Sequence, residues 1–209
     1  MRPTVRPGKI VCVGRNYLEH ARELGNDVPA QPLLFLKPPS SVIGSGEAIV
    51  LPPASARVEY EGEIGVLIGR RLVRASASEA RGAVGAIVAV NDVTARDLQK
   101  TDGQWTRAKG FDTFCPMGPP SPVVPPLEGL EVVTRVNGVE RQRGQSGEMA
   151  FAIPEILSYI SFVMTLEPGD LVATGTPAGV GPLANGDVVE VEVIGASIVR
   201  NPVTAFSVA

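Results

Sequence analysis

The chain has 209 residues, a formal net charge of -3, 44% hydrophobic residues and 20% charged residues, a composition typical of a globular protein with one sizeable core. It contains no basic run and no basic face interleaved with aromatic residues, so we do not expect a nucleic-acid partner. No apolar run reaches the length of a membrane span, and Ile10 to Val13 is too short for a signal-peptide core. We therefore expect a single cytoplasmic domain over residues 1–209, with no membrane partner.

Short β-branched segments bounded by Gly, Pro and Asn predict a mainly β (α+β) protein. In chain order they are KIVCVG (9–14), PLLFLK (32–37), EAIVLP (47–52), EIGVLIG (63–69), GAIVAVNDV (85–93), EVVTRVNGVERQ (131–142), DLVATG (170–175), DVVEVEVIG (187–195) and ASIVRNPV (196–203). The pair Asn137 and Gly138 lies between alternating apolar residues and is typical of a two-residue hairpin turn. The spacing of apolar residues predicts helices at 17–24, 93–100 and 152–165.

Three carboxylates alternate along the stretch EYEGEIGVLIG. Side chains alternate across a strand, so Glu59, Glu61 and Glu63 are expected to share one face, where three unpaired like charges would repel one another. One interpretation is the solvated outer face of a half-buried strand. The other is a divalent cation bound by carboxylate oxygens. A further carboxylate from elsewhere in the chain would favour the cation.

That further carboxylate could come from Asp92, which follows a predicted buried strand. Asp92 either caps the next helix or binds the same cation. Arg96 and Gln99 follow on the same predicted helical face, where Arg96 either pairs with Asp92 or both side chains line a pocket. Lys109 is either a surface lysine whose aliphatic stem covers apolar groups or a fixed cation that stabilises an oxyanion.

His20 is the only histidine in the chain, so a multi-histidine metal site is excluded. Carboxylate ligation favours Mg²⁺, Mn²⁺ or Ca²⁺ over zinc. Glu23 lies three residues later on a short predicted helix, at about 16–25. The two residues are either exposed helix partners, or Glu23 orients the imidazole so that it can deprotonate water.

Two further features are weaker signals. The segment TGTPAGVG (174–181) lacks the GK[ST] ending of a nucleotide phosphate loop, and we expect it to offer backbone N–H groups and the Thr176 hydroxyl to an anion. Cys12 and Cys115 lack the spacing of a zinc site, so we expect two buried thiols.

Six motifs in order closely resemble the fumarylacetoacetate hydrolase superfamily: VGRNYLEHARE, PLLFLKP, YEGEIGVLIG, NDVTARDLQ, WTRAKGFDTFCPMGP and TGTPAGVGPLANGD. The resemblance runs from about Lys9 to Pro202. In length and motifs the chain is most similar to the short, single-domain branch that contains acylpyruvate hydrolases and oxaloacetate decarboxylases. The resemblance implies a mixed β-sandwich roll with a few short helices, usually assembled as a homodimer.

By position, the resemblance also implies roles for individual residues. It makes Glu61, Glu63 and Asp92 the metal ligands and gives Glu59 no role. It implies that Lys109 stabilises an enolate and that His20 and Glu23 form a lid dyad that activates water. The residues that it implies for substrate contact are Lys37, Arg96, Gln99 and Thr176.

The activity implied by the resemblance is metal-dependent cleavage of a C–C bond in a 2-oxo acid such as an acylpyruvate or fumarylpyruvate. Cleavage would leave pyruvate as an enolate held by Mg²⁺, Mn²⁺ or Ca²⁺, and decarboxylation of oxaloacetate would give the same enolate. Isomerisation of 2-hydroxyhepta-2,4-diene-1,7-dioate, or decarboxylation of 5-oxopent-3-ene-1,2,5-tricarboxylate in aromatic catabolism, is the alternative. A non-enzymatic alternative is a binding module with a structural cation. Residues 24–32 and 100–108 are expected to form the variable pocket wall.

Overall fold

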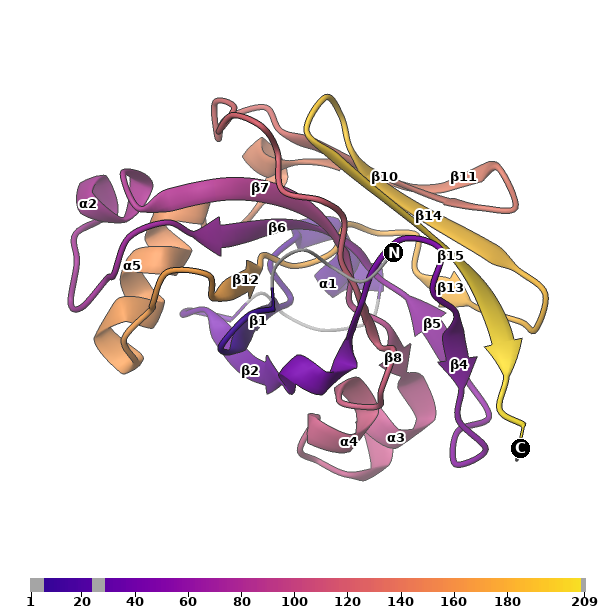
Figure 1. Ribbon diagram of the computed structural model, residues 1–209. Helices are drawn as coiled ribbons and strands as arrows, with labels where there is room; N and C mark the ends of the chain where they lie inside the picture. The colour runs from indigo at the N-terminus through magenta and orange to yellow at the C-terminus, as the bar shows by residue number, and fades with distance from the viewer. Residues whose placement is uncertain (1–5, 24–28, 208–209) are drawn as a thin grey trace.

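The computed structural model describes residues 6–23 and 29–207, except for the side chains of residues 20 and 21. Strands dominate, at 38% against 18% helix, which confirms the predicted fold class (Figure 1). The strands are β1 (Ile10–Gly14), β2 (Leu33–Lys37), β3 (Val42–Ile43), β4 (Ile49–Leu51), β5 (Val58–Tyr60), β6 (Gly62–Ile68), β7 (Val84–Asn91), β8 (Thr94–Ala95), β9 (Cys115–Pro116), β10 (Glu131–Val136), β11 (Val139–Gln145), β12 (Leu171–Ala173), β13 (Gly181–Pro182), β14 (Val188–Val193) and β15 (Ser197–Ala205). The helices are α1 (Leu18–Glu23), α2 (Ala77–Arg81), α3 (Arg96–Thr101), α4 (Thr106–Lys109) and α5 (Ile153–Val163).

Two five-stranded sheets form a sandwich. The first sheet has the order β2-β1-β12-β6-β7 and the second has the order β11-β10-β14-β15-β4. The main core lies between them, where Ile64 and Val66 of β6 join Val132 of β10 and Val191 of β14. Helix α5 adds its buried face to this core, and Figure 1 shows it beside α2 at one end of the sandwich.

The central strands of the first sheet, β1, β12 and β6, are buried on both faces. In β1, Val11 belongs to the main core, while Ile10 and Cys12 point to a second cluster on the opposite face. Cys115 and Met117 cover that second face. Burial raises the pKa of both cysteine thiols, that of Cys115 to about 12, which confirms the prediction of two buried thiols.

The predicted hairpin turn is present between β10 and β11. Asn137 and Gly138 both have positive φ, 53° and 78°, as a type I′ turn requires. The Asn137 side-chain oxygen accepts a hydrogen bond from the backbone N–H of Val188, at 2.9 Å. The turn is thereby tied to the neighbouring strand β14.

The predicted helix at 93–100 is shorter than expected. Thr94 and Ala95 form β8, which pairs with Glu59 and Val58 of β5, and helix α3 begins only at Arg96. Strand pairing satisfies the backbone of these two residues, so tertiary contacts override the helical spacing. Asp92 therefore lies before β8 and is not the cap of α3.

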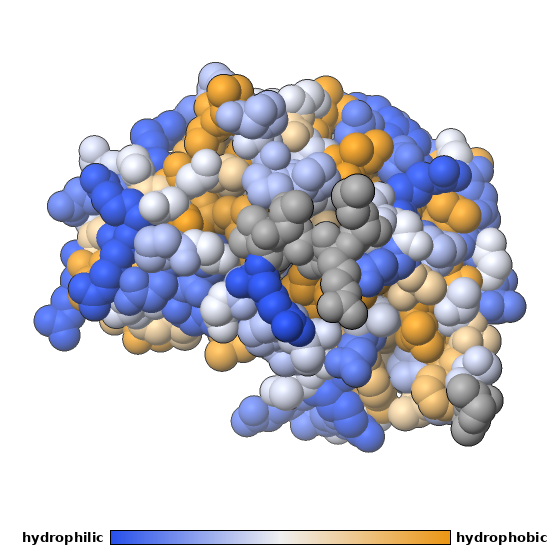
Figure 2. All heavy atoms as spheres, viewed as in Figure 1, coloured by the Kyte–Doolittle hydropathy of each residue, from blue (hydrophilic) through white to orange (hydrophobic). Residues whose placement is uncertain are grey.

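The surface in Figure 2 carries hydrophilic side chains over its left and lower parts, around α2 and α5 and around α3 and α4. Among the residues that the structure describes, no helix has the length and apolar character needed to cross a membrane.

Candidate active site

The acidic strand is interrupted at Glu61. β5 belongs to a three-stranded sheet of order β13-β5-β8, whereas β6 belongs to the first five-stranded sheet, so the chain changes sheets at this residue. The Glu61 N–H donates to the Asn91 side-chain oxygen at 3.0 Å, and the Glu61 carbonyl accepts from the Asp92 N–H at 2.8 Å. These two bonds fix Glu61 opposite Asp92 at the end of β7.

The carboxylates of Glu61, Glu63 and Asp92 converge in the interior. One oxygen from each lies within 4.8 Å of the other two, and the residues are only 5%, 2% and 0% exposed. Glu59 is also buried, at 1% exposure. The solvated-face interpretation is therefore wrong. An all-carboxylate cluster of this spacing fits a hard divalent cation such as Mg²⁺, Mn²⁺ or Ca²⁺.

The pKa of Glu63 shows that nearby positive charge is needed to keep this buried carboxylate cluster ionised. Burial raises the pKa of the Glu63 carboxyl well above the usual range, and the negative charges of Asp92 and Glu61 raise it further. The Gly175 N–H donates to Glu63 Oε2 at 2.8 Å. Gly175 has a φ of 102°, and a Cβ there would lie 2.8 Å from the Cβ of Asn16, so only glycine brings this N–H to Glu63 without strain.

Lys109 supplies part of that positive charge. Its Nζ donates to Glu61 Oε2 at 2.7 Å and to Asp92 Oδ2 at 2.5 Å, and the residue is 2% exposed. Burial alone would lower the pKa of Lys109, but the charges of Asp92 and Glu61 outweigh it and raise that pKa. The surface-lysine interpretation is therefore wrong.

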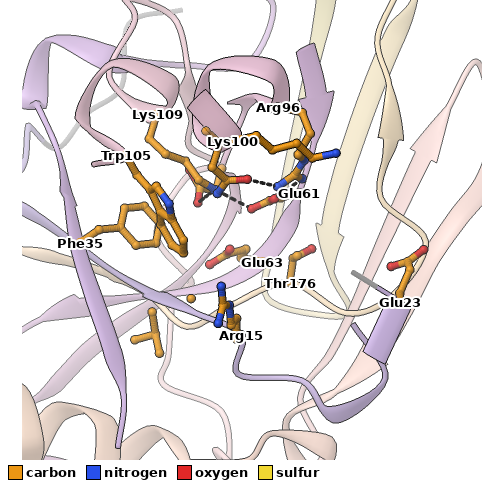
Figure 3. Close-up of a pocket in the computed structure, with 14 residues that line it drawn as sticks. Arg15, Glu23, Phe35, Glu61, Glu63, Arg96, Lys100, Trp105, Lys109 and Thr176 are labelled. Carbon is orange, nitrogen blue, oxygen red and sulfur yellow. Dashed lines mark hydrogen bonds and ion pairs between the residues drawn. The ribbon is translucent and has the colours of Figure 1, made fainter. Parts of the chain in front are cut away.

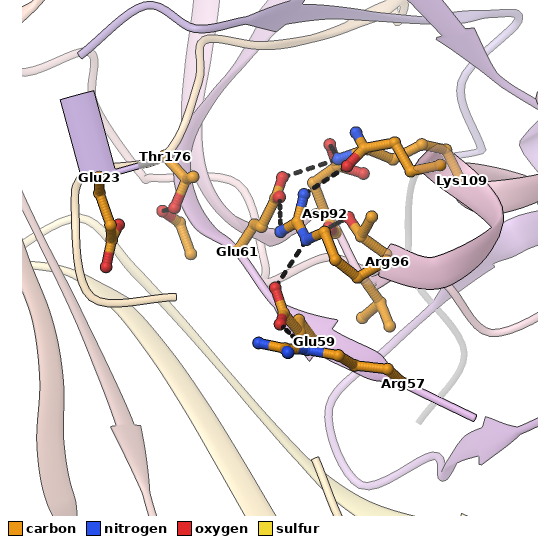
Figure 4. Close-up of polar contacts among 12 residues, drawn as sticks. Glu23, Arg57, Glu59, Glu61, Asp92, Arg96, Lys109 and Thr176 are labelled. Carbon is orange, nitrogen blue, oxygen red and sulfur yellow. Dashed lines mark hydrogen bonds and ion pairs between the residues drawn. The ribbon is translucent and has the colours of Figure 1, made fainter. Parts of the chain in front are cut away.

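Arg96 joins the cluster from the start of α3. Its Nε donates to Glu59 at 2.6 Å, its Nη2 donates to Glu61, and its Nη1 donates to the Gln99 side-chain oxygen at 2.5 Å (Figure 4). Burial would lower the pKa of Arg96, and the carboxylates of Glu61 and Glu59 raise it instead. Of the two interpretations of Arg96, the ion pair with Asp92 is wrong, because Asp92 is held by two lysines, and Arg96 lines the pocket.

The buried contact of Glu59 with Arg96 leads to a stability prediction. Glu59→Ala should lower the free energy of unfolding by about 3–5 kcal/mol, because it leaves part of the Arg96 charge buried without its partner. The matched control is Arg57→Ala: Arg57 binds the other oxygen of Glu59 with a side chain that is 60% exposed. Its removal should cost less than about 1 kcal/mol. Urea denaturation of both variants measures the difference, and equal losses would contradict it.

Lys37 and Thr176, both expected at the substrate, have different positions. The Lys37 side chain is fully buried, and its Nζ donates to Asp92 Oδ1 at 2.7 Å and to the Val93 carbonyl at 3.2 Å. It is not part of the pocket wall, so it lies behind Asp92. Thr176 does line the pocket, although its hydroxyl donates to the Gly62 carbonyl at 2.9 Å and accepts from Gln142.

A pocket of about 450 Å³ opens over the three carboxylates (Figure 3). Gln99, Arg96 and Lys109 line it together with the cluster. The wall includes Lys100 and Trp105, within the expected segment 100–108. The sequence analysis did not predict four other lining residues, Val13, Gly14, Arg15 and Phe35. Phe35 could have been found, because strand alternation places it on the same face as Lys37.

Glu23 lies at the edge of the same pocket, on α1. Both of its carboxylate oxygens accept from the Gly179 N–H, at 3.2 Å each, so α1 contacts the 174–181 segment. The predicted partner, His20, lies in α1, but its side chain is outside the described residues. Residues 24–28 of the expected pocket wall also lie outside them.

Several characterised proteins are similar to this chain. An oxaloacetate tautomerase of Caenorhabditis elegans is 45% identical over 188 residues, which cover 87% of this chain and 88% of that protein. An oxaloacetate decarboxylase of Dictyostelium discoideum is 40% identical over 194 residues, 90% of this chain and 89% of its own length. These relatives are enzymes that are named for small-acid substrates.

Solved structures of enzymes are also similar to this chain. A 2-hydroxyhepta-2,4-diene-1,7-dioate isomerase from Mycobacterium marinum superposes with a TM-score of 0.91 at 42% identity, covering 99% of this chain and 78% of that one. A fumarylpyruvate hydrolase from Pseudomonas aeruginosa, in complex with Mn²⁺ and pyruvate, superposes with a TM-score of 0.89 at 30% identity, covering 97% and 91%. The family model described as fumarylacetoacetate (FAA) hydrolase C-terminal matches residues 9–204. The chain therefore belongs to the fumarylacetoacetate hydrolase family.

Proposed function

We propose that this protein is a divalent-metal-dependent enzyme that cleaves a C–C bond in a small 2-oxo acid, with acylpyruvates and fumarylpyruvate as the preferred class. The observation that carries the proposal is the buried cluster of Glu61, Glu63 and Asp92 beside the Lys109 ammonium in one pocket. A solely structural cation would not require a buried lysine at the same oxygens. The fumarylpyruvate hydrolase that binds Mn²⁺ and pyruvate supports the same class of chemistry.

The donor set fits Mg²⁺, Mn²⁺ or Ca²⁺ and would be supplied by Glu61, Glu63 and Asp92. When bound there, the cation would act as a Lewis acid toward the keto and carboxylate oxygens of a 2-oxo acid. Lys37 would hold Asp92 in place through its 2.7 Å hydrogen bond, and the Gly175 N–H would hold Glu63 in the same way.

The remaining residues would act on the substrate. His20, oriented by Glu23, would take a proton from water as that water attacks the distal carbonyl. The C–C bond then breaks, and its electron pair remains on the pyruvate part as an enolate. The proton taken by His20 is finally transferred to C3 of this enolate. The products are a carboxylic acid and pyruvate. Lys109 would stabilise the enolate charge, while Arg96, Gln99 and Thr176 would orient the substrate.

Oxaloacetate tautomerisation is the second candidate, favoured by the Caenorhabditis elegans relative at 45% identity. It would pass through the enolate of oxaloacetate itself, since a proton is removed from one atom and returned to another without C–C cleavage. Oxaloacetate decarboxylation would instead form the pyruvate enolate by loss of CO₂. Isomerisation of the heptadienedioate is also an enol-keto conversion, supported by the Mycobacterium marinum neighbour.

One assay separates these candidates. Chelator-treated protein is offered acetylpyruvate, fumarylpyruvate, oxaloacetate and 2-hydroxyhepta-2,4-diene-1,7-dioate, each with and without Mg²⁺ or Mn²⁺. Pyruvate release is followed by coupling to lactate dehydrogenase, and tautomerisation by the loss of enol absorbance. We expect metal-dependent pyruvate release from fumarylpyruvate or acetylpyruvate. Turnover of oxaloacetate alone would move the assignment to the second candidate, and no turnover of any compound with bound metal would contradict the proposal.

A further inference from the structure

The charge of the pocket wall suits a substrate with two negative charges. Its cationic side chains are Arg15, Arg96, Lys100 and Lys109, and its anionic side chains are Glu23, Glu61, Glu63 and Asp92. The wall is therefore neutral by itself, and a divalent cation on the three buried carboxylates would leave two positive charges in excess. One carboxylate on the substrate neutralises one of these charges. A second carboxylate neutralises the other.

The cationic side chains of this wall differ in how many ion pairs and hydrogen bonds they already make within the protein. Arg96 and Lys109 are held by buried carboxylates, as described above. The guanidinium of Arg15 makes no hydrogen bond and no ion pair with any of the residues that the structure describes. In Figure 3 it points into the pocket from the wall opposite Lys109 and Arg96. Arg15 therefore has all of its donors available for a ligand.

The backbone of Arg15 is strained, with a φ of 58°, the left-handed region that costs energy for a residue with a Cβ. The next residue, Asn16, is fully buried and holds this turn in place. Its Nδ2 donates to the carbonyls of Thr174 and Phe151, at 2.8 and 3.2 Å, and its Oδ1 accepts from the Phe151 N–H at 2.9 Å. Strain that the surroundings maintain in this way is a feature of functional positions.

The wall next to Arg15 suits the carbon chain of a ligand. Phe35 and Trp105 pack edge to face with 5.2 Å between ring centroids, and both line the pocket. A Cβ at Gly14 would lie 2.9 Å from the Trp105 ring, so the glycine before Arg15 lets the indole close against β1. A ligand held at the three carboxylates can therefore lie along an apolar wall and reach Arg15.

We propose that Arg15 binds the second carboxylate of the substrate and makes the enzyme selective for 2-oxo dicarboxylic acids over 2-oxo monocarboxylic acids. A planar guanidinium can bind a carboxylate through two parallel hydrogen bonds, which gives both energy and orientation. The inference rests on the proposed function, because the first carboxylate and the keto group must lie at the metal cluster. It assigns to Arg15 the choice of substrate and not the bond-breaking step.

The test compares each diacid with its distal methyl ester, which removes one charge at nearly constant size. The pairs are fumarylpyruvate with its distal methyl ester, followed by pyruvate release, and oxaloacetate with its 4-methyl ester, followed by tautomerisation because the ester cannot lose CO₂. Both are assayed with Mn²⁺. We expect the unmodified protein to prefer the diacid in kcat/KM by about 10- to 100-fold, the range of a charged hydrogen bond. Arg15→Gln should reduce this preference to within about threefold, and Arg15→Lys should keep part of it.

Arg107→Gln is the matched control, because Arg107 is an exposed arginine that pairs with Asp102 and does not line the pocket. It should leave the preference for the diacid in place. Thermal denaturation of each variant confirms that it is folded. An equal fall in kcat/KM for diacid and ester in Arg15→Gln, or loss of the preference in Arg107→Gln alone, overturns the inference while the proposed function stands. If the unmodified protein turns over acetylpyruvate but neither diacid, the inference fails while the proposed function stands. No turnover of any of these compounds contradicts the proposed function itself.

Discussion

Asp92→Ala is expected to abolish metal binding and turnover together. Asp92 contributes one of only three carboxylates whose oxygens lie within 4.8 Å of one another, and no described residue replaces it. His20→Ala should keep Mg²⁺ affinity within about threefold, since histidine is not needed in an all-oxygen site. Its turnover should fall by about 10² to 10⁴, the usual contribution of a general base. Calorimetric Mg²⁺ titration and initial rates measure both effects.

The control for this comparison is Glu167→Ala, which removes a half-exposed carboxylate that pairs with Arg71 at the surface. It should leave both metal affinity and turnover unchanged. If His20→Ala loses as much metal affinity as Asp92→Ala, the division between metal ligands and base is incorrect.

Lys109→Met should reduce turnover without reducing metal affinity. The ammonium occupies oxygens of Glu61 and Asp92, so its removal should maintain or increase metal affinity. Turnover should nevertheless fall by about 10² to 10³, the effect of losing one oxyanion-stabilising group. Without metal, the variant leaves buried carboxylates uncompensated, and its free energy of unfolding should fall by about 3–5 kcal/mol. Added Mn²⁺ should restore most of that stability.

Urea denaturation with and without Mn²⁺ measures the loss of stability, its restoration and, from the dependence on Mn²⁺ concentration, the metal affinity. Measurement of kcat gives the change in turnover. Lys100→Met is the control for stability, because Lys100 is exposed and should change the free energy of unfolding by less than about 0.5 kcal/mol. A joint loss of metal affinity and turnover in Lys109→Met would mean that the lysine organises the metal site.

The sequence predicts most strands because their alternation is local. It also predicts that Glu59, Glu61 and Glu63 share a face, since side-chain direction follows from the strand period. It does not predict their burial, because the compensating charges come from Arg96 and Lys109, at least 35 residues further along the chain. Pairing across such a distance leaves no periodic signal. The role of Glu59 as the partner of Arg96 was missed for this reason.

Two other errors have separate physical causes. The strand β8 interrupts a predicted helix, because pairing with β5 outweighs a short helical pattern. The positive φ of Arg15 could not be predicted from its residue type, because arginine has no preference for the left-handed region. Only the buried hydrogen bonds of Asn16, which need residues 151 and 174, hold that conformation.

The position of β12 determines which fragments of the chain could form the carboxylate cluster. This three-residue strand lies between β1 and β6 in the first sheet, pairing with Ile10 to Cys12 on one side and with Gly65 to Leu67 on the other. A fragment that ends before residue 171 would contain all three proposed metal ligands and Lys109. It would still lack the strand that joins the two halves of their sheet, and the Gly175 N–H that holds Glu63. During synthesis, the complete carboxylate cluster, with Glu63 held by the Gly175 N–H, can therefore form only after residue 175 has been made.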